Sequence, residues 1–121
     1  MMTEIFARGP ISCALNSEAS NFVNYHGGVI KCPKDSSDKS CYGRSDHVVV
    51  IAGFGVDKDG TKYWVGRNSY GTRWGEGAGG GWFRLERGVN ALNVESSPCR
   101  WATPLQESVQ IAIKQFDAAA A

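Results

Sequence analysis

The chain has 121 residues, 42% of them hydrophobic, which suits one modest core rather than two domains. Its 13 Lys and Arg side chains nearly balance its 12 Asp and Glu. Because both signs are scattered, there is no basic stripe to bind phosphates, and we expect no nucleic-acid partner. No apolar run approaches the roughly 20 residues that cross a bilayer, so we expect no membrane partner, and no targeting signal is recognisable.

The first part of the chain predicts a short helix and a short strand. Residues 3–9 permit a helix, which should end at Gly9 and Pro10. The apolar segment ISCAL that follows predicts a strand. One more helical turn is expected within residues 18–25. Residues 31–45 are polar and rich in turn formers, which indicates a surface insertion.

The central part of the chain predicts a sheet. The β-branched run HVVVIAGFGV, the turn DKDG and the segment TKYWVGR together predict a hairpin over residues 47–67. A glycine-rich loop leads to a further strand, WFRLERG, and ALNVES predicts a last short one. We therefore predict an α+β fold: an antiparallel, partly closed β-sheet or barrel with a short N-terminal helix.

The end of the chain predicts a separate tail. Apolar residues fall at helical spacing after Pro104, namely Leu105, Val109, Ile113 and Phe116. This spacing is typical of an amphipathic helix. The sequence therefore predicts one domain over residues 1–104 and a tail over residues 105–121 with a possible helix.

Two polar residues could do chemistry at one end of the predicted hairpin. His47 opens its first strand, and Asn68 follows its second strand. A histidine that acts as a general base needs one ring nitrogen facing the nucleophile and the other bound to an acceptor, a role that the Asn68 amide oxygen suits. Taken alone, however, a histidine beside a buried strand is more often structural.

The four cysteines match no CxxC metal pattern, and only two histidines could add ligands, so we expect no metal. Disulfides suit an oxidising compartment better than free thiols, and four cysteines allow three pairings. No organic cofactor is expected either.

Three segments in order, DHVVVIAGFG, YWVGRNSYGTRWGE and GWFRLERG, resemble the papain family of cysteine peptidases. The resemblance implies that His47 is the catalytic histidine and that Asn68 orients it. It also places Asp46, Tyr70 and Trp74 beside the substrate, with Tyr70 replacing the tryptophan that usually shields the His–Asn pair. As structural alternatives, Asp46 is a turn former and Trp74 a packing residue.

Further segments, MMTEIFARGPISCAL, NYHGGVI and NALNVESSPC, are similar to the cathepsin X (or Z) subgroup of that family. This resemblance implies disulfides between Cys13 and Cys99 and between Cys32 and Cys41, a lysosomal or secreted location, and carboxypeptidase activity on a peptide or protein substrate.

In the family, the nucleophilic cysteine, the oxyanion-hole glutamine and the loop that binds the substrate carboxylate lie in an amino-terminal half. No matching segment occurs in this sequence. The resemblance therefore implies that the amino-terminal half of a papain-like domain is a partner and that the chain alone is inactive. Two alternatives remain open, a non-catalytic interaction module and an inactive truncated product.

Overall fold

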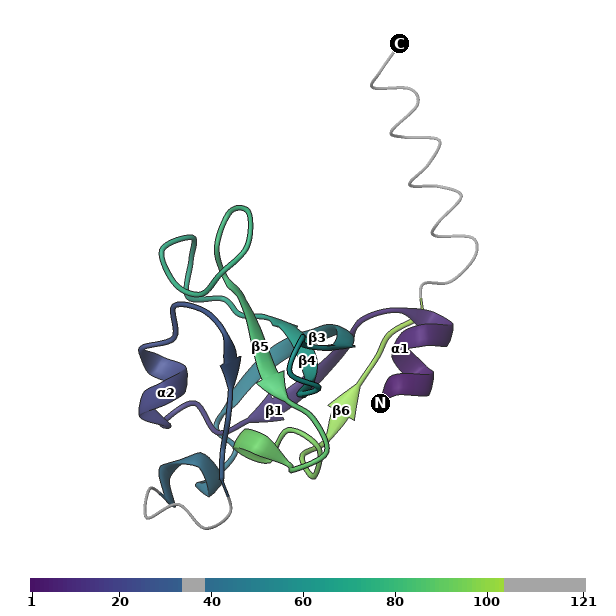
Figure 1. Ribbon diagram of the computed structural model, residues 1–121. Helices are drawn as coiled ribbons and strands as arrows, with labels where there is room; N and C mark the ends of the chain where they lie inside the picture. Colours follow the sequence, from purple (N-terminus) through teal and green to yellow (C-terminus); the bar gives the residue numbers. More distant parts are fainter. Residues whose placement is uncertain (34–38, 104–121) are drawn as a thin grey trace.

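The computed structural model describes residues 1–33 and 39–103. Its centre is a six-stranded sheet with the order β2-β5-β4-β3-β1-β6 (Figure 1). The strands are β1 (Ile11–Leu15), β2 (Val29–Ile30), β3 (His47–Val56), β4 (Lys62–Arg67), β5 (Trp82–Glu86) and β6 (Cys99–Arg100).

Four short helical segments surround this sheet. In Figure 1, α1 (Met2–Arg8) lies beside β6 and α2 (Ser20–Val23) lies at the opposite side of the molecule. The helix α1 ends at Gly9, whose φ of 93° is in the left-handed region that glycine adopts at low cost. The two 3₁₀ segments are η1 (Lys39–Tyr42) and η2 (Ala91–Asn93).

The sheet is mixed and open. Strands β1, β3, β4, β5 and β6 pair antiparallel, whereas β2 pairs parallel with β5. The α+β class and the short N-terminal helix are confirmed, but the expected partial closure is not found. In the described part of the chain β2 and β6 do not pair with each other, and with two residues each they are too short to close a barrel.

The core lies on one face of the sheet because apolar side chains alternate along its strands. Gly66 on β4 faces Phe83 on β5, and a Cβ atom at Gly66 would lie 2.1 Å from the Phe83 ring, so this close packing requires glycine. The buried side chains on this face are Ile11, Cys13, Leu15, Val49, Ile51, Trp64, Phe83 and Leu85.

The prediction of a strand over ALNVES was wrong. Asn90, Leu92 and Asn93 have positive φ values of 57°, 53° and 62°, which an extended strand excludes. The Glu95 side chain stabilises this turn because its carboxylate accepts bonds from the backbone N–H groups of Gly88 (2.7 Å) and Asn90 (2.8 Å). The last strand is β6, and the predicted helix in residues 105–121 lies outside the described residues.

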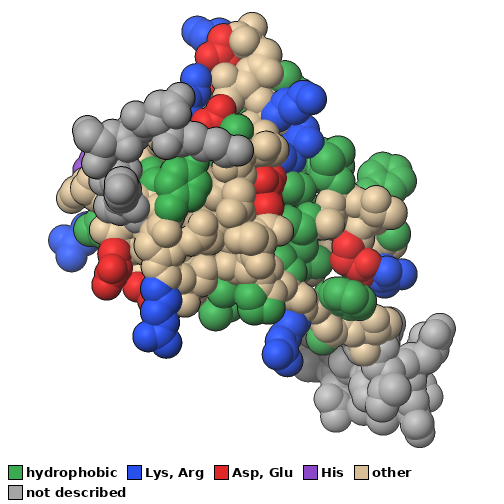
Figure 2. Space-filling model, turned by 90° about the horizontal axis from the view of Figure 1, so that it is seen from below, with side chains coloured by type: hydrophobic (Ala, Val, Ile, Leu, Met, Phe, Trp, Pro, Cys, Tyr) green, Lys and Arg blue, Asp and Glu red, His purple; other side chains and the backbone are tan. Residues whose placement is uncertain are grey.

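The fold contains two disulfides, one between neighbouring strands and one that closes a short loop. Cys13 on β1 is bonded to Cys99 on β6, and Cys32 is bonded to Cys41 at the base of the polar segment 31–45. This is the pairing that the resemblance implied. Within residues 1–33 and 39–103, no helix is long and apolar enough to cross a membrane. On the face seen in Figure 2, basic and acidic side chains are interspersed.

Candidate active site

The β3–β4 hairpin brings His47 and Asn68 together at one end of the sheet. His47 is the first residue of β3, and Asn68 directly follows the last residue of β4. The antiparallel register pairs Val50 with Arg67, which places the two side chains within reach. The His47 Nε2 atom lies 2.8 Å from the Asn68 Oδ1 atom, a hydrogen-bond distance.

A second hydrogen bond fixes the orientation of the Asn68 amide group. The backbone N–H of Ser69 donates to Asn68 Oδ1 at 2.8 Å, so the oxygen, not the nitrogen, must face His47. His47 Nε2 therefore donates its proton to this oxygen. In the neutral ring the lone pair is then on Nδ1, which leaves that nitrogen able to accept a proton from a nucleophile.

Aromatic rings cover the His47–Asn68 hydrogen bond. Asn68 is only 6% exposed. The Tyr70 and His47 rings lie 5.1 Å apart between centroids, and Trp74 meets Tyr70 edge-on at 5.6 Å. Tyr70 remains 44% exposed, so its ring forms the outer cover of the site. A hydrogen bond shielded in this way exchanges less readily with water.

Phe22 on α2 is a site residue that sequence reasoning missed. It is fully buried, and its ring contacts the rings of His47 (6.4 Å), Tyr70 (6.1 Å) and Trp74 (5.1 Å). The sequence signal was weak: an aromatic residue next to Val23 in a short helical turn. Phe22 supports the aromatic cover from the core side.

Trp74 is held by backbone groups of α2. Its indole Nε1–H is shared between the carbonyl oxygens of Phe22 (3.2 Å) and Val23 (3.0 Å). The ring also packs against Tyr25 at 5.5 Å. These contacts favour the structural interpretation of Trp74 and connect α2 to the loop 68–81.

An ion pair anchors the loop 68–81 to the sheet. Arg84 on β5 donates to both carboxylate oxygens of Glu76, at 2.7 and 3.2 Å, and Glu76 also accepts from the Gly28 N–H at 3.3 Å. Arg84 lowers the pKa of Glu76 below its usual range. Burial raises the pKa of the neighbouring Tyr25 to about 12, so its phenol remains protonated.

Asp46 stabilises the start of β3. Its exposed carboxylate accepts a hydrogen bond from the Ser17 N–H at 2.9 Å, and this bond is the main reason that its pKa is lowered. The backbone N–H of Asp46 also donates to the Leu15 carbonyl oxygen at 3.0 Å. These bonds link the residue before His47 to the end of β1.

The described part of the chain contains no free cysteine, since all four form the two disulfides. It also contains no group of three or more His, Cys, Asp or Glu side chains placed to hold a metal ion. The imidazole of His47, oriented by its bond to Asn68, is a group that could transfer a proton.

The comparisons with known proteins identify the family of this chain. The family model described as papain family cysteine protease matches residues 1–102, and the chain belongs to this family. The recognition made from the sequence motifs is thereby confirmed.

Relatives and solved structures indicate the same family. Cathepsin Z of Onchocerca volvulus is 35% identical over 112 residues, which cover 87% of this chain and 33% of that protein. A chain from a structural study of the mite allergens Blo t 1 and Der p 1 superposes with a TM-score of 0.66 at 31% identity, covering 81% of this chain and 29% of that one.

A second similar structure is bromelain from Ananas comosus in complex with the inhibitor E64. It has a TM-score of 0.58 at 32% identity, with 74% of this chain and 39% of that one covered. This chain thus spans between 29% and 39% of the length of these three proteins.

Proposed function

We propose that this chain supplies the histidine and asparagine of a Cys–His–Asn site that hydrolyses peptide bonds, with residues 1–104 as the functional domain. The observation that supports this most is the His47–Asn68 hydrogen bond of 2.8 Å beneath the Tyr70 ring. It orients the imidazole with Nδ1 free, as a base serving a thiol requires.

In this proposal His47 transfers a proton twice. Its Nδ1 atom first takes the proton of the nucleophilic thiol, which gives a thiolate and an imidazolium. After the thiolate has attacked the peptide carbonyl, the imidazolium protonates the leaving amine. Asn68 keeps the ring in position and stabilises its charged form through the bond to Nε2.

The thiol must come from another polypeptide segment because the four cysteines of the chain are bonded in pairs. We propose the amino-terminal half of a papain-like domain as this partner. Val48 and Val50, which follow His47 on β3, are 60% and 39% exposed. Such apolar exposure on the face of β3 opposite to His47 is consistent with a surface that a partner covers.

The substrate is proposed to be a peptide or protein that contacts the exposed side of the site. Asp46 precedes His47 and Tyr70 packs on its ring, and both are proposed substrate-binding residues; Trp74, which packs on Tyr70, is proposed to contact the substrate in addition to its structural role. The two disulfides suit an oxidising compartment, which supports a lysosomal or secreted location. The resemblance to the cathepsin X (or Z) subgroup favours release of carboxy-terminal residues, with cleavage within the peptide chain as the alternative.

Complementation tests this function. The chain is combined with the amino-terminal half of a cathepsin Z relative, and release of a carboxy-terminal residue from a labelled peptide is measured. We expect thiol-dependent hydrolysis that His47→Ala abolishes, whereas Asn68→Ala leaves a weaker activity because the base remains. If the His47→Ala complex retains full activity, the proposal is wrong.

The bonded cysteines also favour a second candidate, a non-catalytic interaction module. In that case the chain would bind the amino-terminal half without producing hydrolysis. The complementation experiment distinguishes the peptidase from the interaction module when size-exclusion chromatography is used to monitor formation of the complex.

A further inference from the structure

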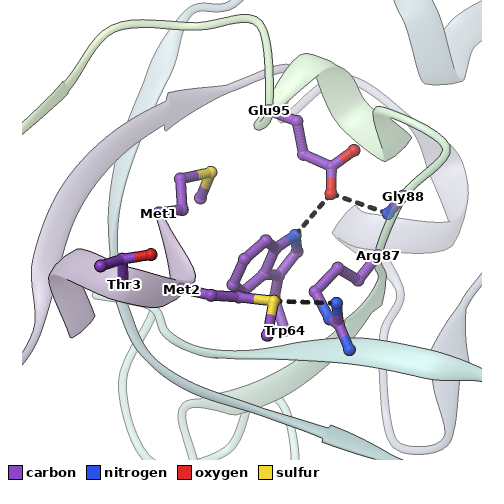
Figure 3. A pocket seen from close by; sticks show the side chains of 7 residues that line it. All are labelled: Met1, Met2, Thr3, Trp64, Arg87, Gly88 and Glu95. Carbon is purple, nitrogen blue, oxygen red and sulfur yellow. Dashed lines mark hydrogen bonds between the residues drawn. The ribbon is translucent and has the colours of Figure 1, made fainter. Parts of the chain in front are cut away.

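A pocket of about 460 Å³ opens between the start of α1 and the end of β5 (Figure 3). Its lining residues include neither His47 nor Asn68. The side chains of Met1 and Met2 and the indole of Trp64 form apolar walls. Its volume is within the range of roughly 300–1,000 Å³ that is typical of small-molecule sites.

In the part of the chain that the structure describes, the Arg87 guanidinium of this pocket has no anionic partner. Its Cζ atom lies 5.5 Å from the Trp64 ring centroid and 5.8 Å from that of Phe54. Nη1 contacts the Met2 sulfur at 3.0 Å, a weak acceptor, and the buried Nε has no hydrogen-bond partner. Among residues 1–33 and 39–103, Arg87 forms no ion pair, so most of its donors remain available.

The nearby Glu95 carboxylate forms no ion pair with Arg87 in the described part of the chain, and its oxygens bind N–H groups instead. One oxygen accepts from the Trp64 Nε1–H at 2.9 Å and from the Gly88 N–H at 2.7 Å. The other oxygen accepts from the Asn90 N–H at 2.8 Å. Figure 3 shows the first two of these bonds. Three N–H groups thus stabilise the Glu95 carboxylate and hold it in place, and its bond to Trp64 fixes the indole wall, so a bound ligand would have to orient its own carboxylate toward Arg87 and away from Glu95.

We propose that this pocket binds a small organic carboxylate with an apolar body. The carboxylate would accept hydrogen bonds from the unpaired Arg87 guanidinium, whose fork of donors matches its geometry. The apolar body would lie against Met1, Met2 and Trp64. This site is separate from the proposed peptidase site and does not depend on that function.

The first test uses the unmodified 121-residue chain and needs no variant. The ¹⁵N-labelled chain is titrated with 3-phenylpropionate and, as a matched neutral control, with 3-phenylpropionamide. We expect saturable shifts of the Trp64 indole N–H and the Gly88 amide with the acid. The amide should bind roughly tenfold or more weakly because it cannot form a charge-assisted bond. Absence of saturable shifts with the acid, or equal binding of both compounds, would overturn the proposal.

Two variants test the role of Arg87. Arg87→Gln should abolish the preference for the acid, and Arg87→Lys should retain the charge but bind more weakly, since an ammonium lacks the planar fork. Arg44→Gln, at an exposed arginine outside the pocket, is the matched control and should bind like the unmodified chain. Unchanged acid preference in Arg87→Gln would contradict the assignment.

The carboxylate could belong to a free acid or to a peptide carboxyl terminus. N-acetyl-Leu-Phe and its C-terminal amide distinguish these sources in the same titration. If the peptide acid shifts the Trp64 indole N–H as 3-phenylpropionate does, the pocket accepts peptide termini. If only 3-phenylpropionate does so, the ligand is a small acid, and in both cases the binding of a carboxylate is supported.

Discussion

Asn68 determines which ring nitrogen of His47 is available for proton transfer. Its Oδ1 atom accepts a hydrogen bond from His47 Nε2 at 2.8 Å. A second hydrogen bond, from the backbone N–H of Ser69 to the same oxygen, disfavours the flipped orientation of the amide group. The Asn68 Nδ2 atom is buried without a partner in the described part of the chain, so this amide is retained at a cost in stability. We regard the orientation of His47 as the benefit that outweighs this cost.

Asn68→Ala should therefore release the His47 ring. Without the acceptor, the Nε2 proton is no longer held, and the ring should populate both neutral tautomers. The measurement is ¹⁵N NMR of the imidazole nitrogens in the isolated chain. Asn24→Ala, at an exposed asparagine, should leave the ring signals unchanged. A single Nε2–H tautomer that persists in Asn68→Ala would contradict this role.

Tyr70 shields that hydrogen bond by its ring rather than by its hydroxyl. Tyr70→Ala should speed exchange of the His47 Nε2 proton with water, while Tyr70→Phe and Tyr70→Trp should preserve slow exchange because a ring still covers the bond. Proton exchange measured by NMR distinguishes these variants. If Tyr70→Phe exchanges as fast as Tyr70→Ala, the hydroxyl and not the ring is responsible.

Residue-level prediction succeeded where contacts are set locally. The proximity of His47 and Asn68 follows from one hairpin, whose strands are rich in β-branched and aromatic residues. The contact of Phe22 with Tyr70 joins residues 48 positions apart that belong to different elements, and no local pattern specifies it. Phe22 was missed for this reason.

At the level of elements, the loop 68–81 depends on the Glu76–Arg84 ion pair. The pKa of Glu76 is lowered from its ordinary value of 4.5. The stabilisation by the ionised Glu76 carboxylate is therefore fully present above pH 4.5. The contribution is lost as the pH falls through the lower pKa of the folded state.

Glu76→Gln should consequently destabilise the chain at neutral pH by about 1 kcal/mol or less, since both side chains are partly exposed. The difference from the unmodified chain should shrink as the pH falls below 4.5 and through the lower pKa that Glu76 has in the folded state. Urea unfolding between pH 7 and pH 3 measures it, with the exposed Glu18→Gln as a control. A difference that stays constant over this range would exclude the ionised pair as its cause.

Elements with strong periodicity were predictable, and those formed by long-range pairing were not. The hairpin, β1 and β5 follow from alternating apolar residues. The parallel pairing of β2 with β5 joins two residues to a strand more than 50 positions later, which no local signal indicates. The segment after β5, for which a strand was predicted, forms η2 instead, because Asn90 and Asn93 adopt left-handed backbone conformations.

For the whole molecule, the Cys13–Cys99 disulfide closes the fold. Strand β6 pairs with β1 at only two positions, so the covalent bond is its main attachment. The bond spans 86 residues of sequence, whereas Cys32–Cys41 spans 9. In the chain-entropy model the Cys13–Cys99 bond stabilises the fold by about 4 to 5 kcal/mol and the Cys32–Cys41 bond by about 3 kcal/mol.

A double substitution of Cys13 and Cys99 by serine should therefore lower the free energy of unfolding more than the same change at Cys32 and Cys41. Urea unfolding of the two variants at one pH provides the comparison. A greater loss in the variant without the Cys32–Cys41 bond would contradict the ranking by loop length.

We propose that this chain holds an oriented base but no nucleophile, since its four cysteines are bonded in pairs. This proposal is tested most directly by incubating the isolated 121-residue chain with a labelled peptide, with and without a thiol-alkylating reagent, and measuring release of the carboxy-terminal residue. We predict no cleavage in either sample, because His47 has no thiol to activate. Robust cleavage that alkylation does not inhibit, and that His47→Ala does not reduce, would contradict the account.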